Sequence, residues 1–130
     1  MAVPDAEAHD RAYMQARLHE EIARGRRYGC RFALLLFEAL PSADGLHMRQ
    51  KVEYALAAIT TTVRPSDVVA RVFEDAVMVL LVETDPRGAR DALIRIRSRV
   101  ARQAGNWQVT TYTYPEHEQA IEMLPVLAAA

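Results

Sequence analysis

The chain has 130 residues, 51% of them hydrophobic and 25% charged, which is enough for one domain with a sizeable core, so we expect residues 1–130 to form a single domain. Sixteen basic and seventeen acidic residues give a formal net charge of −1, which argues against a nucleic acid polymer as a partner. No apolar stretch reaches the ~20 residues that span a bilayer and the first residues are polar, so we expect no transmembrane segment and a cytoplasmic protein.

A helix, a buried strand and a second helix are predicted first. Apolar side chains recur at every fourth position within residues 9–27, which is typical of one face of a helix. Residues 31–40 form an almost unbroken apolar run, as in a strand that is buried on both faces. A turn over residues 41–45 then leads to residues 48–63, where apolar positions again follow helical spacing.

A hairpin and a third helix follow. Residues 67–73 and 76–82 are rich in β-branched side chains, and because only two residues separate them they predict a tight hairpin. Asp85 supplies an N-cap and Pro86 a favourable first helical residue, so the third helix is expected to run from Pro86 to about Ala104.

The last predicted elements complete a recognisable order. Residues 107–114 are rich in strand formers, and the apolar tail over residues 121–130 either covers the sheet or forms a docking surface. Strand, helix, strand, strand, helix, strand is the order of a ferredoxin-like α+β fold, here with an added N-terminal helix. The strand residues expected to be buried are Phe32, Leu34, Leu36, Val79 and Leu81.

Thiol and imidazole chemistry find little support. Cys30 is the single cysteine, which excludes a disulfide framework and a thiolate zinc cluster, and we expect it to be a small buried apolar residue. The four histidines have no metal-binding spacing. We therefore predict no metal site and no cofactor.

Residues 64–81, RPSDVVARVFEDAVMVLL, resemble the signature of the GGDEF, or diguanylate cyclase, family. In that family RxxD is followed after five residues by GG[DE]EF and then by an apolar strand. The resemblance extends over roughly residues 9–114 and implies the GGDEF-like form of the ferredoxin-like fold.

The catalytic motif is degenerate. In place of its five residues stand Phe73, Glu74, Asp75, Ala76 and Val77, of which only Asp75 matches. The resemblance implies that the two missing glycines let the backbone approach a triphosphate, so an aromatic ring and an added negative charge would block and repel that ligand. We therefore expect an inactive diguanylate cyclase homologue, not an enzyme.

Other family features are weakened as well. Glu38 matches the metal-binding aspartate after the first strand, and with Asp75 it could hold a hard cation weakly, although solvated acids at strand ends are the preferred interpretation. The segment that supplies guanine contacts in the family is shorter here, and no basic residue follows Arg102.

The inhibitory motif is retained. Arg64 and Asp67 match the family's RxxD site, which binds cyclic di-GMP, and Arg95 falls where the family often has a further ligand-binding arginine. A guanidinium can fork onto guanine or phosphate, and a carboxylate can accept from guanine N–H groups. The alternative is that Arg64 pairs with Asp67 at a corner, and Arg95 with Asp91 along a helix.

These observations favour an inactive GGDEF-like domain that acts as a cyclic di-GMP receptor or signalling adaptor through Arg64, Asp67 and Arg95. Its expected partners are cyclic di-GMP and either a protein partner or further copies of the chain. The alternative is a nucleotide-free scaffold for protein–protein interaction. A residual cyclase that relies on Glu38 and Asp75 is the least favoured hypothesis.

Overall fold

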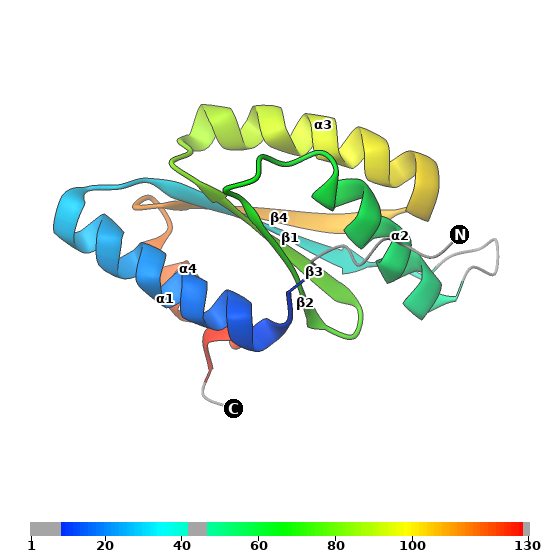
Figure 1. Ribbon diagram of the computed structural model, residues 1–130, viewed down its shortest axis with the longest axis horizontal. Helices are drawn as coiled ribbons and strands as arrows, with labels where there is room; N and C mark the ends of the chain where they lie inside the picture. Colours follow the sequence, from blue (N-terminus) through cyan, green and yellow to red (C-terminus); the bar gives the residue numbers. More distant parts are fainter. Residues whose placement is uncertain (1–8, 42–46, 129–130) are drawn as a thin grey trace.

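Helices cover both faces of a four-stranded antiparallel sheet in the computed structural model, which describes residues 9–41 and 47–128 (Figure 1). The elements in chain order are α1 (Arg11–Tyr28), β1 (Phe32–Ala39), α2 (Met48–Thr60), β2 (Val68–Phe73), β3 (Ala76–Val82), α3 (Pro86–Ala104), β4 (Trp107–Tyr114), α4 (Glu118–Glu122) and a final 3₁₀ turn, η1 (Pro125–Leu127). The strands lie in the order β2-β3-β1-β4. The predicted ferredoxin-like core with an added N-terminal helix is confirmed.

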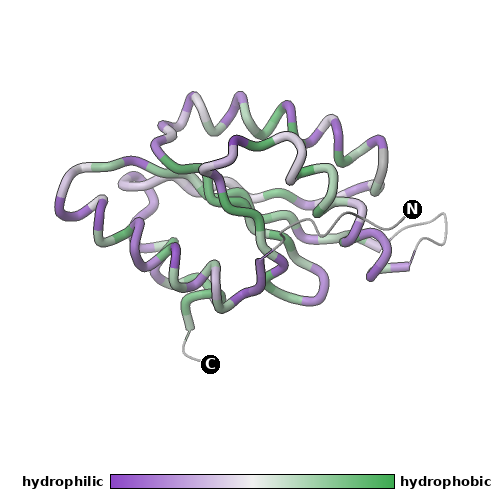
Figure 2. The backbone as a smooth tube through the Cα atoms, in the orientation of Figure 1, coloured by the Kyte–Doolittle hydropathy of each residue, from purple (hydrophilic) through white to green (hydrophobic). Residues whose placement is uncertain are grey.

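The central position of β1 explains its apolar sequence. It pairs with β3 on one side and β4 on the other, so that Leu34 lies opposite both Leu80 and Tyr112. Figure 2 shows the resulting apolar centre of the sheet. Four of the five strand residues predicted to be buried are buried, but Leu36 is only partly buried where it packs against the apolar cluster on the α1 face.

Two apolar clusters fill the layers on either side of the sheet. Helices α2 and α3 cover one face, and α1 covers the other together with the chain end (Figure 1). The α2–α3 cluster includes Leu35, Phe37, Ile59, Val79 and Ile96, and the α1 cluster includes Met14, Leu18, Leu34, Leu80 and Ile121. Since successive strand side chains point to opposite faces, neighbouring residues of β1 serve different clusters.

The apolar tail covers the sheet. Ile121, Leu124 and Val126 are buried in the α1 cluster, so this part of the tail contributes to the core instead of offering a docking surface. The last two residues of the predicted tail lie outside the described part of the chain, as does most of the predicted turn over residues 41–45. No helix in the described ranges is long and apolar enough to cross a membrane.

Local hydrogen bonds determine where the helices begin and end. Asp85 caps α3 as predicted, because its carboxylate accepts from the Gly88 N–H at 2.8 Å. Helix α2 ends at Thr60, three residues before the predicted Val63. The hydroxyls of Thr61 and Thr62 both donate to the Ala58 carbonyl, which leaves the Thr62 N–H to bond the Ile59 carbonyl three residues back.

Candidate functional site

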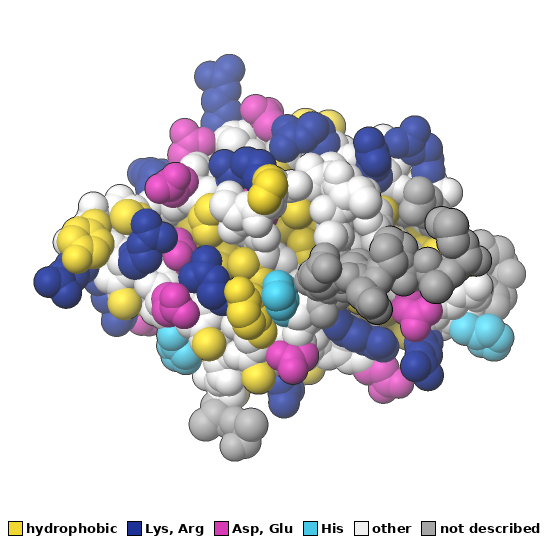
Figure 3. Space-filling model, viewed as in Figure 1, with side chains coloured by type: hydrophobic (Ala, Val, Ile, Leu, Met, Phe, Trp, Pro, Cys, Tyr) yellow, Lys and Arg dark blue, Asp and Glu magenta, His cyan; other side chains and the backbone are white. Residues whose placement is uncertain are grey.

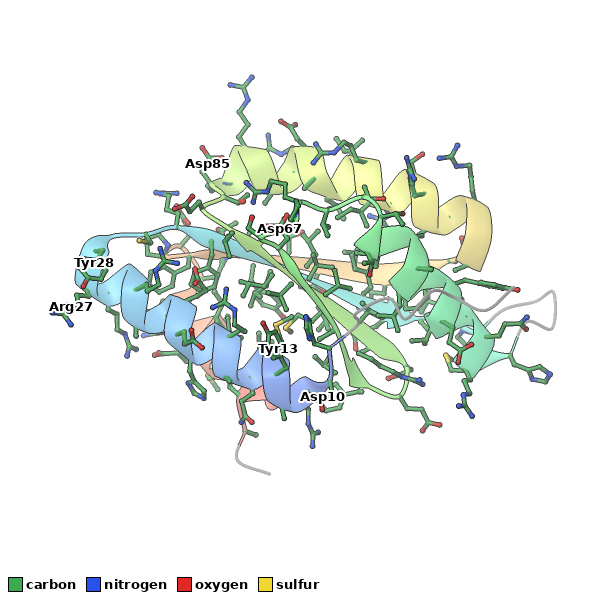
Figure 4. All side chains as sticks on the ribbon, viewed as in Figure 1. Asp10, Tyr13, Arg27, Tyr28, Asp67 and Asp85 are labelled. Carbon is green, nitrogen blue, oxygen red and sulfur yellow. The ribbon has the colours of Figure 1, made fainter. Side chains whose placement is uncertain are left out.

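A cavity of about 640 Å³ lies at the end of the sheet where β2 begins and β3 ends. Three connecting segments converge on it, those after α1, after α2 and before α3, and the first three turns of α3 form its remaining wall. The three residues predicted to bind a ligand, Arg64, Asp67 and Arg95, all line this cavity. Figure 4 labels Asp67 at the start of β2 and Asp85 at the start of α3, both beside the cavity.

Residues Arg64 to Asp67 form a closed turn. The Asp67 N–H donates to the Arg64 carbonyl at 2.9 Å, and the Asp67 carboxylate accepts from the Arg64 N–H at 3.0 Å. Pro65 occupies the second position of the turn, where its restricted φ is favourable. The turn therefore brings the two side chains of the RxxD motif to the same side of the chain.

The guanidinium of Arg64 is held by several acceptors. Its Nε donates to Oδ2 of Asp67 at 3.1 Å and its Nη2 to Oδ1 at 2.9 Å, which is a forked ion pair. Nη2 also donates to the Val82 carbonyl at 2.6 Å and to the Thr84 hydroxyl at 2.9 Å. The hydrogen bond to Asp67 raises the pKa of Arg64, although half of the Arg64 side chain remains exposed.

Asp67 is nearly buried, with 2% of its side chain exposed. Its Oδ1 accepts from the Val82 N–H at 3.2 Å in addition to Arg64, and its Oδ2 accepts twice from Arg64. Both oxygens are therefore engaged within the chain, and the corner pair that the sequence left as an alternative is formed. In this arrangement Asp67 holds Arg64 in place and does not itself face the cavity with an unpaired oxygen.

The backbone at Glu83 makes these contacts possible. Glu83 has a φ of 48°, a left-handed conformation that is uncommon for residues other than glycine. The reversal at Glu83 places the Val82 carbonyl and the Thr84 hydroxyl where Nη2 of Arg64 reaches both. Glu83 lines the cavity, but sequence patterns do not identify it, since nothing local marks this conformation in advance.

Arg95 and Asp91 lie one turn apart on α3 and both are exposed at the cavity wall. The helical ion pair considered as an alternative is not formed between them, so each side chain has its charge available to a ligand. Among the further lining residues that the sequence does not predict are Cys30 and Arg31, which precede β1. Arg31 is paired with Glu116 at 2.9 Å, and Cys30 is half-buried instead of buried because it lines the cavity.

The residues compared with the GGDEF signature lie at the opposite end of the sheet. Phe73 ends β2 opposite Ala76, which begins β3, and Glu74 and Asp75 form the two-residue turn between them, as predicted. Arg71 donates to the Glu74 carbonyl at 2.7 Å. The ring of Phe73 packs against the α1 cluster with the guanidinium of Arg11 5.4 Å from its centre.

The two acids compared with metal ligands lie at this same end. Glu38 is half-buried in β1 and lies opposite Ala76, next to Asp75 in sequence. The Ala39 N–H donates to the Asp75 carbonyl at 2.9 Å, which ties the turn to the end of β1. Within the described ranges, no three His, Cys, Asp or Glu side chains are grouped closely enough to hold a metal ion.

Comparison with known proteins identifies the fold. No protein-family model and no curated protein matches this sequence. Among solved structures, a DGC protein from Thermotoga maritima is similar with a TM-score of 0.73 at 18% identity, covering 94% of this chain and 96% of that one. Diguanylate cyclase SiaD from Pseudomonas aeruginosa, solved with its activator SiaC, is similar with a TM-score of 0.72 at 18% identity, covering 92% of this chain and 53% of that one.

A third structure extends the comparison. The GGDEF domain of DgcB from Caulobacter crescentus, solved in complex with cyclic di-GMP, has a TM-score of 0.67 at 15% identity and covers 82% of this chain and 71% of that one. The described chain therefore has the fold of GGDEF domains. At these identities the similarity establishes the fold, and function has to be argued from the site.

Proposed function

We propose that this chain is a catalytically inactive GGDEF-like domain that acts as a cyclic di-GMP receptor or signalling adaptor. The observation that carries the proposal is that Arg64, Asp67 and Arg95, which come from two distant segments, line one cavity. That cavity lies at the other end of the sheet from the catalytic motif. Its volume of about 640 Å³ falls within the ~300–1,000 Å³ typical of small-molecule sites.

Different side chains of the cavity are suited to different groups of the ligand. Arg95 has no described partner, so its guanidinium can fork onto a phosphate or onto O6 and N7 of a guanine. Arg64 enters the cavity already charged and oriented by Asp67, which lowers the entropic cost of ordering it on binding. With both oxygens of Asp67 engaged, exposed Asp91 is the better acceptor for the N–H groups of a guanine.

The hairpin supports the absence of cyclase activity. The two positions that are glycines in the GGDEF signature carry a packed aromatic ring, Phe73, and an exposed carboxylate, Glu74. Adding side chains where bare backbone approaches phosphate removes room for the ligand, and a carboxylate repels a triphosphate.

The similar structures are consistent with these partners. The DgcB domain is solved with cyclic di-GMP and SiaD with a protein activator, so both a dinucleotide and a protein occur as partners of this fold. For this chain we propose cyclic di-GMP in the cavity and a separate protein, or a second copy, as the reader of the signal.

Calorimetric titration of single-site variants tests the proposed site. Arg95→Ala should weaken cyclic di-GMP binding by about tenfold or more, equivalent to about 1.4 kcal/mol. The matched control is Arg49→Ala, since Arg49 is an exposed arginine at the other end of α2 and should leave binding unchanged. Equal affinities for wild type, Arg95→Ala and Arg49→Ala would contradict the proposed site.

One observation favours the alternative of a nucleotide-free scaffold. The Arg64–Asp67 pair is complete without a ligand, since it joins the turn to the end of β3 through Val82 and Thr84. Such a pair stabilises the corner without a ligand, so a structural role alone is sufficient to explain the two residues. If wild-type protein shows no binding of cyclic di-GMP at high micromolar concentration, the scaffold is the better account.

A further inference from the structure

The charge of helix α3 differs from that of the rest of the chain. It contains six arginines and one aspartate, a formal charge of +5, whereas the whole chain carries −1. All six arginines are exposed. Figure 3 shows basic side chains along the outer surface of the molecule where α3 lies.

These arginines also differ from the others in their contacts. Outside α3, all nine arginines have a partner within the described residues, either an acid, a backbone carbonyl or an aromatic ring. None of the six on α3 has a hydrogen bond, ion pair or ring contact with any described residue. Helix α3 therefore carries a row of positively charged side chains that are not paired with any described residue.

Part of this row lines a groove of about 520 Å³ between α3 and the end of α2. Arg95, Arg99 and Arg102 follow one another at helical spacings of four and three, so they lie on one side of α3. Thr61 and Thr62 form the opposite wall. Ile94 also borders the groove with 63% of its surface exposed, so it offers an apolar contact beside the charges.

We propose that this groove, the α3 groove, binds an acidic amphipathic helix of a partner protein. Arginines spaced by one helical turn match carboxylates spaced by one turn on the opposing helix, and exposed Ile94 supplies an apolar anchor between the charges. Helix α3 is about 28 Å long at 1.5 Å per residue, long enough to contact about five turns of such a partner.

A single-stranded nucleic acid fits these features less well. Proteins that bind single strands combine basic grooves with aromatic side chains on which the bases stack. The exposed aromatic residues of the described chain are Tyr13, Tyr28 and Tyr54, none of which belongs to α3 or borders the groove. The excess of acidic residues elsewhere on the chain also disfavours a long polyanion.

The inference goes beyond cyclic di-GMP binding and does not depend on it. Arg95 borders both the ligand cavity and the α3 groove, whereas Arg99 and Arg102 border only the groove. Variants at the latter two positions therefore test the groove without altering the proposed ligand site.

The test uses fluorescence polarisation with a labelled peptide of about 18 residues, designed as a helix with glutamates at spacings of four and three beside a row of leucines. The whole chain should bind this peptide saturably, and the double variant Arg99→Glu/Arg102→Glu should weaken binding by about tenfold or more. Ile94→Asp should weaken it as well. The control Arg49→Glu makes one such charge reversal on α2 and should have little effect.

Two comparison probes complete the test. A peptide of the same composition, scrambled so that the glutamate row is lost, should bind at least about tenfold more weakly than the designed peptide. A single-stranded oligonucleotide of about 12 nucleotides should also bind more weakly than the designed peptide. The proposal would be overturned by an absence of saturable peptide binding, by equal binding of the scrambled peptide, by tighter binding of the oligonucleotide, or by indifference to Ile94→Asp and to the double variant.

Discussion

Both carboxylate oxygens of Asp67 accept from the guanidinium of Arg64, at 2.9 and 3.1 Å, while the carboxylate itself remains almost completely buried. The pair is anchored from two directions, since Asp67 also accepts from the Val82 N–H and Arg64 also donates to the Val82 carbonyl. The RxxD motif thus connects the turn before β2 to the end of β3. One pair of residues therefore serves the stability of the corner and the orientation of Arg64 toward the cavity.

Asp67→Ala should lower the free energy of unfolding by about 2 kcal/mol. The substitution leaves the Val82 N–H without its acceptor and removes the carboxylate from the guanidinium, and an unsatisfied buried donor costs about 1–3 kcal/mol. Urea unfolding followed by circular dichroism measures the change. Asp67→Asn keeps one acceptor oxygen and should cost less than Asp67→Ala, so equal stability of all three proteins would show that the corner is not a stabilising element.

The protein should form no cyclic di-GMP from GTP in the presence of Mg²⁺ or Mn²⁺. The reason is that Phe73 and Glu74 carry side chains where the GGDEF signature has glycines. Chromatography of the nucleotides after prolonged incubation provides the measurement, with a reaction lacking protein as the control. Product above that control which disappears in Asp75→Ala would establish a residual cyclase instead.

Leu34→Ala should cost about 2–5 kcal/mol of stability, because the side chain is fully buried at the centre of the sheet opposite Leu80. Leu36→Ala, two residues along the same strand and on the same face, should cost clearly less because Leu36 is only partly buried. Thermal and urea unfolding of the two variants give the comparison. A larger loss for Leu36→Ala would mean that the α1 cluster is packed differently.

Gly25→Ala should destabilise the protein although alanine favours helices by about 1 kcal/mol over glycine. A Cβ at this position of α1 would meet the ring of Tyr114, which is itself buried and stacked on Phe32. Overpacking of this kind typically costs about 1–3 kcal/mol.

A second substitution separates this clash from other effects of the new methyl group. In Gly25→Ala/Tyr114→Leu the ring is absent, so the added methyl group should be tolerated better than in wild-type background. Unfolding free energies of the four proteins in this cycle give the coupling between the two positions. Additive effects would show that Gly25 and Tyr114 do not constrain one another.

Local signals account for what could be predicted of the fold. The bounds of β3, α3 and β4 coincide with the predicted ones, because β-branched runs and the Asp85 cap are features of neighbouring residues. The end of α2 could not be predicted, since it depends on a competition between threonine hydroxyls and the backbone for the Ala58 carbonyl.

The candidate site likewise has a part that could be predicted from the sequence and a part that could not. The resemblance to the GGDEF signature predicts that Arg64, Asp67 and Arg95 belong to one site, and in the structure all three line one cavity. The hydrogen bonds to both Asp67 oxygens could not be predicted from the sequence. They depend on Val82 and on the left-handed backbone at Glu83, and these residues come close to Asp67 only because β2 pairs with β3. We propose that Asp91, in place of Asp67, accepts from the N–H groups of a guanine.

Calorimetric titration of the wild-type chain with cyclic di-GMP, run beside Arg64→Ala, measures whether the cavity binds this ligand through Arg64. We expect saturable binding to wild type, weakened by about tenfold or more in Arg64→Ala because the held guanidinium is lost from the cavity wall. Circular dichroism of the variant checks that it remains folded. An absence of binding to folded wild type at high micromolar ligand, or equal affinity for both proteins, would show that this cavity is not a cyclic di-GMP site.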